Sequence, residues 1–341
     1  MTCGGDFLTL GLESSCDDTA VAVLRGARDV RSELLSSQTL DHAPFGGVVP
    51  EFAARRHLEA FLPLTAEALR RAGVREPRDE VGLVAVTSGP GLMGALMVGV
   101  MAAKALSLAW DKPVIGVNHL EGHIFANVVS FPDLLPPFLC MIVSGGHTEI
   151  VLVRGFGDYL LLGGTRDDAA GEAYDKVAKA LGLPYPGGPV IDSLAASGDP
   201  AAFDFPLPLR GSQEVEFSFS GLKTAAATLI GRMTRDGGRI PLEDFCASFQ
   251  RAVTEALMNK LRLASRLTGV RSVSVSGGVA ANSALREALR REPGWRVCIP
   301  PRDRCTDNAV MIAAAGYAAY QRGERSSLSL APDPSWEIWK K

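Results

Sequence analysis

Short apolar runs alternate with longer segments of helical periodicity along most of this chain. Residues 7–12 and 19–24 are β-like runs separated by the polar turn ESSCDD, which predicts a hairpin. The next long segment, 50–73, carries apolar side chains at helical spacing. Buried-type strands are predicted at 81–87 and 114–117, with a glycine-rich turn and an Ala/Met/Val-rich helix between them. This alternation of strands and helices predicts α/β layers.

A second series of the same kind follows residues 125–137, where FPDLLPP interrupts regular structure. Strands predicted at 138–143 and 149–153 flank the turn SGGHT and form another hairpin. Further elements are predicted in DDAAGEAYDKVAKALGL (helix), 242–267 (helix), 272–275 (strand), SGGVAANSALREAL (turn and helix) and NAVMIAAAGYAAYQRG (helix). Each half of the chain therefore begins with a hairpin, which is a repeat of architecture rather than of sequence.

The composition supports two cores and excludes several classes of protein. The chain has 341 residues, of which 47% are hydrophobic, and this is longer than most single domains. Its formal net charge of -3 gives no general basic field, so nucleic-acid binding would need a local patch or a helper protein. The six cysteines are scattered without a CxxC pair, which argues against a disulfide framework and a thiolate zinc cluster.

Two features bear on localisation. The N-terminal sequence MTCGGDFLTLGLESS lacks a basic start followed by an apolar run, so no secretory signal is expected. The longest mostly apolar stretch, 89–110, contains Lys104 and is rich in Gly and Ala, so a buried helix is expected rather than a membrane span. We therefore expect a cytoplasmic protein without a membrane partner.

Three turns indicate a nucleotide site. They are ESSCDDT (13–19), VSGGHT (143–148) and VSGGVAAN (275–282), and two of them place VSGG after an apolar strand. Glycine lets backbone N–H groups approach a phosphate, and a following helix adds its positive dipole end. Any single Gly-Gly pair is more simply a tight turn, but three such turns in one chain favour nucleotide binding.

The segment His119-Leu120-Glu121-Gly122-His123 indicates a metal site. Histidines four residues apart lie on one helix face, where both imidazoles can reach one ion. Glu121 follows the first histidine by two positions rather than one and points elsewhere on the helix, so this is not the HExxH arrangement of metalloproteases. Asp307, in the polar turn CTDNA before a helix, is the best candidate for a third ligand. Two capping or core histidines remain the alternative.

Other charged residues allow two interpretations each. Asp175 and Asp192 could accept hydrogen bonds from ribose hydroxyls, although carboxylates on helix faces are usually just solvated. Arginines cluster in and after the first long helix, and a solvated helix face is slightly favoured over a strip for RNA. This cluster comprises Arg55, Arg56, Arg70, Arg71, Arg75 and Arg78.

An ordered set of motifs between residues 8 and 320 resembles one known family. The motifs include GLESSCDDTAVAV, FGGVVPEFAARRHLE, SGPGLMGALMVG, NHLEGH, VSGGHTEIV, FSFSGLKTA, SGGVAANSALR and TDNAVMIA. They resemble the universal tRNA threonylcarbamoyladenosine transferases (bacterial TsaD type), formerly called O-sialoglycoprotein endopeptidases. The resemblance implies an α/β fold of two actin-like domains of the sugar kinase/Hsp70 (ASKHA) type around a nucleotide cleft. The expected domains are 1–128 with 308–341, and 129–307.

The implied reaction transfers threonylcarbamoyl from threonylcarbamoyl-AMP to the exocyclic amine of the adenosine 3′ of the anticodon, in tRNAs reading codons that begin with adenine. His119, His123 and Asp307 match the family's metal ligands, with iron(II) preferred and zinc the second choice. Glu13 matches an acidic residue near the first phosphate turn and is the candidate catalytic residue, although no proton acceptor is assigned. The matching adenylate-binding positions are Ile142, Val143, Ser144, Gly145, Gly146, Asp175, Gly188, Asp192 and Asn282.

The resemblance also implies partners. They are the tRNA substrate, a TsaB-like paralogue, a TsaE-like ATPase and an upstream TsaC-type enzyme that forms the adenylate. The sequence departs mildly from the family pattern at Ser14, Asp18, Phe45 and Gly164, none of them a metal position. Three other functions stay open: a metalloprotease, a small-molecule carbamoyltransferase or nucleotide-binding module on the same fold, and a scaffold without activity.

Overall fold

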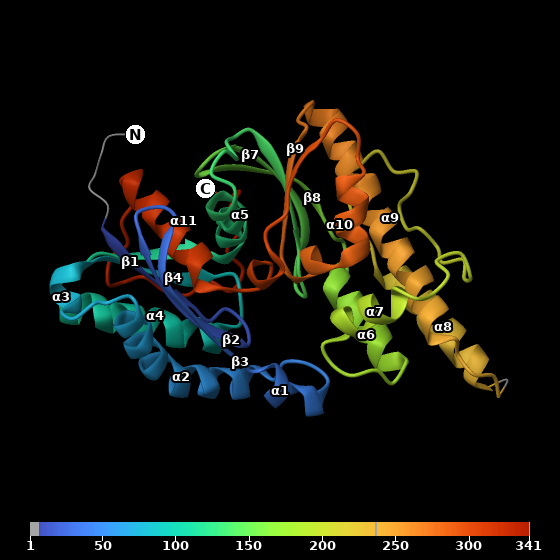
Figure 1. Ribbon diagram of the computed structural model, residues 1–341, viewed down its shortest axis with the longest axis horizontal. Helices are drawn as coiled ribbons and strands as arrows, with labels where there is room; N and C mark the ends of the chain where they lie inside the picture. Colours follow the sequence, from blue (N-terminus) through green and yellow to red (C-terminus); the bar gives the residue numbers. More distant parts are fainter. Residues whose placement is uncertain (1–6, 236, 341) are drawn as a thin grey trace. The chain divides into compact units, whose positions relative to one another are not determined.

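The computed structural model describes residues 7–235 and 237–340, and the chain divides into two compact units (Figure 1). The first unit is Met1–Asp133 with Asp307–Lys341, and the second is Leu134–Thr306. These boundaries lie five residues after and one residue before those expected from the sequence. Asp307 therefore belongs to the same unit as the two histidines of NHLEGH. Cys3 lies outside the described residues.

The first unit is built on a five-stranded sheet in the order β3-β2-β1-β4-β5. The central strand β1 pairs antiparallel with β2 and parallel with β4. Strand β4 is buried over eight of its nine positions, as expected of a central strand covered on both faces. The strands are β1 Leu8–Glu13, β2 Asp18–Arg25, β3 Asp29–Ser37, β4 Val81–Gly89 and β5 Val114–Asn118.

Helices cover both faces of this sheet (Figure 1). Leu10 and Leu12 of β1 belong to one core cluster with Phe61 of α2 and Val100 of α4. Gly11 points to the other face, where a Cβ atom would overlap with the backbone of α11, so only glycine allows α11 to pack this closely. The helices are α1 Thr39–His42, α2 Pro50–Arg71, α3 Pro77–Glu80, α4 Met93–Trp110, α5 His119–Ser130 and α11 Ala309–Gln321, with a 3-10 turn at Ala43–Phe45.

The second unit repeats this topology. Its sheet has the order β10-β9-β6-β7-β8, and β6 pairs antiparallel with β7 and parallel with β9. This equivalence confirms the architectural repeat predicted from the two hairpins. The strands are β6 Phe138–Val143, β7 Thr148–Gly155, β8 Asp158–Gly164, β9 Ser272–Ser276 and β10 Arg296–Cys298.

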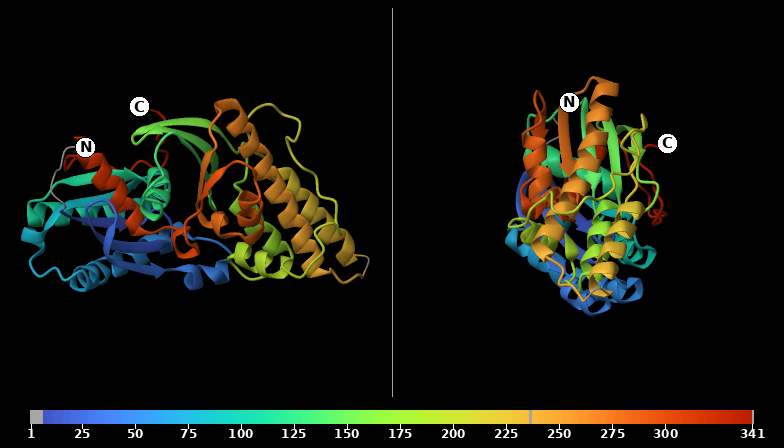
Figure 2. Two further views of the ribbon diagram at one scale, coloured as in Figure 1. Left: turned by 45° about the horizontal axis from the view of Figure 1, so that its top comes forward. Right: turned by 90° about the vertical axis from the view of Figure 1, so that its right-hand side faces the viewer.

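The helices of the second unit pack around one aromatic and aliphatic core. Tyr174, Phe245 and Phe249 are among its largest buried side chains. Helix α9 contributes the most buried residues and ends at Gly269, whose left-handed backbone (φ 71°) caps it. The helices are α6 Ala170–Ala180, α7 Gly187–Ala195, α8 Ser220–Arg235, α9 Leu242–Thr268 and α10 Ser283–Arg290, with 3-10 turns at Gly278–Ala281 and Arg302–Arg304 (Figure 2).

Helix α4 differs from the expected buried helix. Among the described residues it is the one helix long and apolar enough to cross a membrane, although only a third of its residues are buried. One face, including Leu96, Val100 and Ala103, packs inside the unit. The opposite face leaves Met97 and Met101 about half exposed. One face of the helix is therefore buried and the other exposed, but both are apolar, which accounts for the membrane-like composition.

Candidate metal centre and nucleotide pocket

The start of α5 is fixed by Asn118, the residue before the first histidine. Its Oδ1 accepts hydrogen bonds from the backbone N–H of Leu120 (2.9 Å) and Glu121 (3.4 Å), which caps the helix. Its Nδ2 donates to the carbonyl oxygen of Trp336 (2.9 Å), in the segment after α11. Asn118 therefore links the C-terminal segment to the helix that carries both histidines.

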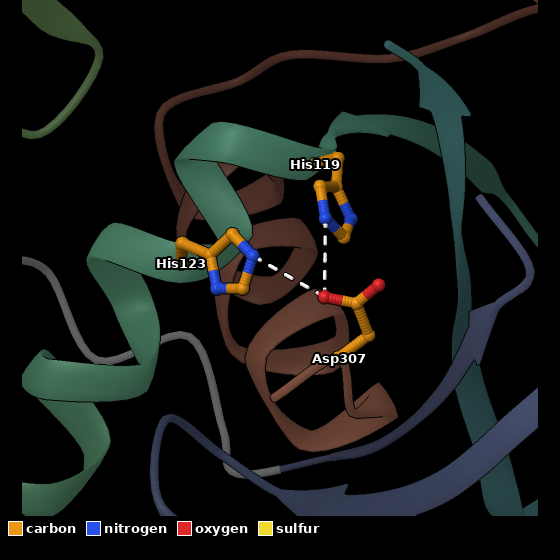
Figure 3. Close-up of side chains that lie close together, drawn as sticks. All are labelled: His119, His123 and Asp307. Atoms are coloured by element: carbon orange, nitrogen blue, oxygen red, sulfur yellow. Dashed lines mark ion pairs between the residues drawn. The ribbon is translucent and has the colours of Figure 1, made fainter. Parts of the chain in front are cut away.

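The two histidines and Asp307 converge on one point (Figure 3). The Nε2 atoms of His119 and His123 each lie 3.3 Å from Oδ1 of Asp307. Ligand atoms held about 2.1 Å from a tetrahedral ion would be about 3.4 Å apart, so this spacing matches a coordination site. Asp307 directly precedes Asn308, whose side chain caps α11 by accepting from Met311 N (3.0 Å).

The environment of His123 supports a metal ion. The side chain is 1% exposed, Nδ1 has no hydrogen-bond partner within the described part of the chain, and Nε2 faces the Asp307 carboxylate at 3.3 Å without forming a well-aligned hydrogen bond. A buried imidazole whose nitrogens form no well-aligned hydrogen bond is unfavourable, because its polar atoms have lost water without full compensation. A cation bound at Nε2 would remove this cost. The three side chains therefore fit a divalent metal.

Glu13 holds His119 in a defined orientation. The Glu13 side chain is fully buried, and Oε2 lies 3.0 Å from Nδ1 of His119. The same carboxylate accepts from the hydroxyl of Thr87 (2.6 Å) and from Ser15 N (2.5 Å). A carboxylate at Nδ1 keeps the proton on that nitrogen and leaves Nε2 free to bind a metal. Glu13 ends strand β1, directly before the turn ESSCDDT, and its side chain lies behind His119, one of the candidate metal ligands.

Opposing charges shift the pKa values within the centre. Burial disfavours the charged form of His119, but the carboxylates of Asp307 and Glu13 outweigh it and hold its pKa well above 6.5. Burial would raise the pKa of Asp307, but His119 and His123 hold it well below 3.8. A proton on His119 therefore takes the place of the cation in the metal-free protein, and metal binding must displace it.

A pocket of about 680 Å³ lies in the second unit, within the range of small-molecule sites. Five of the predicted adenylate-binding residues line it: Gly145, Asp175, Gly188, Asp192 and Asn282. They come from the β6–β7 turn, α6, α7 and the turn before α10, so four segments of the chain meet here. Thr306 also lines the pocket, and the next residue is the metal-site carboxylate Asp307.

Four other predicted residues do not line the pocket. Ile142 and Val143 are buried in strand β6 and belong to the interior of the sheet. Ser144 shapes the turn instead, because its hydroxyl accepts from the N–H groups of Gly146 (3.3 Å) and His147 (3.0 Å). These residues thus support the backbone of the turn that brings Gly145 to the pocket.

The polar residues of the pocket are held by neighbouring loops. Asp192 accepts from the hydroxyl (2.5 Å) and N–H (3.1 Å) of Ser283. Asn282 caps α10 through Leu285 N (3.0 Å) and donates to Gln250 Oε1 (2.6 Å). These bonds fix two segments far apart in sequence, α7 and the start of α10, around one cavity.

Outside the turn VSGGVAAN (275–282), most of the pocket wall carries no recognisable sequence signal. Gly171 is one missed residue whose role is steric, since a Cβ there would lie 2.6 Å from the carbonyl oxygen of Ser144. The sequence shows that Gly171 follows Asp-Asp-Ala-Ala, but it does not show that the backbone there comes close to the turn at Ser144. Gly278, Val279 and Ala281 belong to the predicted turn VSGGVAAN, and the lining residues without any prediction are Gly171, Tyr174, Pro186, Pro189, Ser193, Ala196, Ser283, Arg302 and Thr306.

Solved structures of low sequence identity share the fold. Full-length HypF in a phosphate- and nucleotide-bound form superposes with a TM-score of 0.60 at 15% identity, covering 95% of this chain and 56% of that chain. Component A of (R)-2-hydroxyglutaryl-CoA dehydratase from Acidaminococcus fermentans gives a TM-score of 0.56 at 16% identity, covering 92% and 99%. These likenesses confirm the predicted α/β fold with two actin-like domains.

Sequence comparisons identify the family. The family model TsaD, tRNA N6-adenosine threonylcarbamoyltransferase, matches residues 29–314. A protein of that name from Anaeromyxobacter dehalogenans (strain 2CP-1) is 51% identical, covering 96% of this chain and 99% of the relative. One from Thermosipho africanus is 48% identical, covering 97% and 100%. The chain therefore belongs to the tRNA N6-adenosine threonylcarbamoyltransferase family and is a tRNA-modifying transferase.

Proposed function

We propose that the chain transfers threonylcarbamoyl from threonylcarbamoyl-AMP to the exocyclic amine of the adenosine 3′ of the anticodon, in tRNAs that read codons beginning with adenine. The main observation in support is that the pocket and the candidate metal site include residues that are neighbours in the sequence. Thr306 lines a cavity large enough for a nucleotide, and Asp307, the next residue, offers a ligand atom to the histidine pair. A donor that combines an adenylate with an activated carbonyl needs both kinds of site.

The second-unit pocket would bind the adenylate part of the donor. Asp175 and Asp192 lie at its wall, where carboxylates can accept hydrogen bonds from ribose hydroxyls. Gly188 leaves open space where a side chain would stand, so the first turn of α7 can lie against the ligand. Because the donor is already an activated mixed anhydride, the main task of these residues is to position it.

The metal centre would act on the carbonyl part of the donor. The family is metal-dependent, and His119, His123 and Asp307 would hold the ion. Two histidines and one carboxylate with open positions are typical of non-haem iron(II), so iron(II) is proposed, with zinc as the alternative. When bound, the ion supplies Lewis-acid polarisation of an oxygen. Glu13, enclosed by three partners, would orient His119 rather than take the proton of the attacking amine.

Filling the pocket tests the donor site. A Gly188→Val change adds a side chain in open space and leaves the protein contacts intact, so the affinity for AMP should fall at least about tenfold while the melting temperature stays unchanged. Calorimetric titration with AMP measures the effect. Gly221→Val on α8 is the matched control, because a Cβ there also meets nothing within 4 Å and Gly221 lies outside the pocket lining. Equal AMP affinity in both variants would contradict the proposed site.

The proposed partners are a TsaB-like paralogue, a TsaE-like ATPase and a TsaC-type enzyme that supplies the adenylate, all acting with tRNA in the cytoplasm. A surface for the paralogue is available on α2 and α4, which pack against each other. The two helices expose six large apolar side chains, called here the apolar strip, and such exposure is typical of interaction surfaces. The strip consists of Leu58, Leu62, Met93, Met97, Met101 and Leu108.

A charge on this strip is expected to disrupt the paralogue complex. Met97 is 49% exposed, so Met97→Glu should leave the fold intact and weaken association by about tenfold or more. Size-exclusion chromatography of the mixed proteins measures the complex. Leu267→Glu, at an exposed position of α9, is the control and should leave association unchanged. A complex of undiminished stability with the Met97 variant would exclude this surface.

A further inference from the structure

A second hollow, of about 570 Å³, adjoins the nucleotide pocket in the second unit. It lies over α10 and the 3-10 turn that begins at Arg302. Ser283 and Arg302 line both cavities, so the hollow and the pocket share a wall. The hollow is lined by Ser283, Ala284, Arg286, Glu287, Arg290 and Arg302.

Two of these residues, Arg286 and Glu287, already have bonding partners within the protein. Arg286 is 8% exposed, and its guanidinium donates to the carbonyl oxygens of Ala280 (2.8 Å) and Pro300. Glu287 forms an ion pair with Arg291 (2.7 Å). The carboxylate that lines the hollow is therefore neutralised from outside the hollow.

Arg290 and Arg302 remain as cations available to a ligand. Both are exposed, and in residues 7–235 and 237–340 no side-chain hydrogen bond or ion pair holds either guanidinium. Two guanidinium groups at one polar hollow favour an anion, and arginine matches the oxygens of a phosphate with two parallel hydrogen bonds.

The arginines of α2, the other candidate for a basic strip, are paired with acidic side chains. Arg55 bonds Glu51 (2.7 Å), and Arg56 lies 3.1 Å from Asp41 and from Glu59. Arg70 and Arg71 share Glu67. These pairs neutralise the helix face and support the interpretation that it is solvated. In a chain of formal charge -3, unpaired arginines beside the nucleotide pocket are a more suitable place for a polyanion.

We propose that Arg290 and Arg302 form a phosphate subsite that binds a backbone phosphodiester of the acceptor tRNA beside the donor pocket. The proposal rests on the proposed function in one respect, namely that the adjoining pocket holds the donor nucleotide. The attacking adenosine must come to that donor, and the phosphates that flank it come with it. The phosphate of the donor itself is the competing source of the same chemistry.

The double variant Arg290→Gln/Arg302→Gln tests the subsite in the full chain assembled with its partners. The affinity for unmodified tRNA should fall about tenfold, and the dependence of log Kd on log salt concentration should become shallower by about one. The single variant Arg290→Gln, at a residue that does not line the nucleotide pocket, should keep the AMP affinity of the native chain. Arg154→Gln is the control in the same unit, because Arg154 is exposed, is paired with Asp158 and lines neither cavity, and it should bind tRNA like the native chain.

Two results would overturn the subsite. If AMP affinity falls and tRNA affinity does not, the arginines serve the donor phosphate. If neither affinity changes while melting temperatures are equal, the hollow binds no phosphate. Failure of the proposed donor chemistry is distinguishable: the native assembly would then give no transfer from threonylcarbamoyl-AMP, whereas loss of tRNA affinity in the double variant would still establish the subsite.

Discussion

Replacing His123 with alanine is expected to remove the bound metal and to slow threonylcarbamoyl transfer by at least about 100-fold. The physical reason is the small number of ligands. His119, His123 and Asp307 are the one group of three metal-binding side chains found among the described residues, so losing one leaves only two protein ligands. Metal per chain, measured by elemental analysis, and transfer rate should fall together.

His42→Ala provides the control for this variant. His42 is also buried, but its ring bonds Gln38 and the N–H of Val49, away from the centre. The control should lose stability and keep its metal, which separates the effect of removing a buried ring from that of removing a ligand. A His123 variant that retains one metal per chain at the native transfer rate would exclude His123 as a ligand.

The metal affinity is also expected to rise with pH across the neutral range. In the metal-free protein the pKa of His119 is raised by its carboxylate neighbours, so a proton competes with the ion. In the metal-free protein, the contribution of His119 to the free energy of unfolding changes with pH in the opposite direction: it falls as the pH rises. The stabilising pairing of protonated His119 is present below its unfolded pKa and is lost as the pH rises through the folded pKa. Metal titrations at several pH values should show proton release on binding.

The second large effect is expected for Glu13→Gln, which changes almost no volume. The amide can still accept from Ser15 N, but its NH2 group would then face Nδ1 of His119. Nδ1 would become an acceptor, the proton would move to Nε2, and the ring would lose its ability to bind the metal through that nitrogen. We expect metal affinity to fall by about 10- to 100-fold.

Calorimetric metal titration of the Glu13 variant measures this effect independently of activity. Thr87→Val is the graded control, because it removes one hydrogen bond to the carboxylate and leaves the contact with His119 in place. Its metal affinity should therefore fall less. If Glu13→Gln binds metal as tightly as the native chain, the carboxylate does not set the tautomer of His119.

The strongly patterned parts of the fold could be predicted from the sequence. The hairpin at ESSCDD appears as β1 and β2, and the apolar run 81–87 appears as the buried strand β4. Strands β3, β8 and β10 and helices α1, α3, α7 and α8 escaped prediction, and the missed strands lie at sheet edges and carry weak patterns. Strand β3 mixes exposed and half-buried positions, and strand β10 has three residues. Edge strands bury little, so their residues are under little compositional constraint.

The three candidate metal ligands could not be predicted equally well from the sequence. His119 and His123 lie one helical turn apart, so local geometry alone brings them together. Asp307 depends on the packing of α11 against α5, which no local pattern contains. The pocket was harder, because its wall combines glycines and prolines from separate turns. Gly171 and Pro186 have no chemistry of their own, and only the fold shows that they meet.

The most direct test of the central claim is transfer from purified threonylcarbamoyl-AMP to unmodified tRNA by the native chain with its partners. We predict threonylcarbamoyl on the adenosine 3′ of the anticodon, formed without ATP-dependent synthesis of the donor and lost in the His119→Ala/His123→Ala variant. Partners that are demonstrably active with a known transferase, combined with no modified adenosine from this chain, would contradict it and favour a small-molecule carbamoyl acceptor.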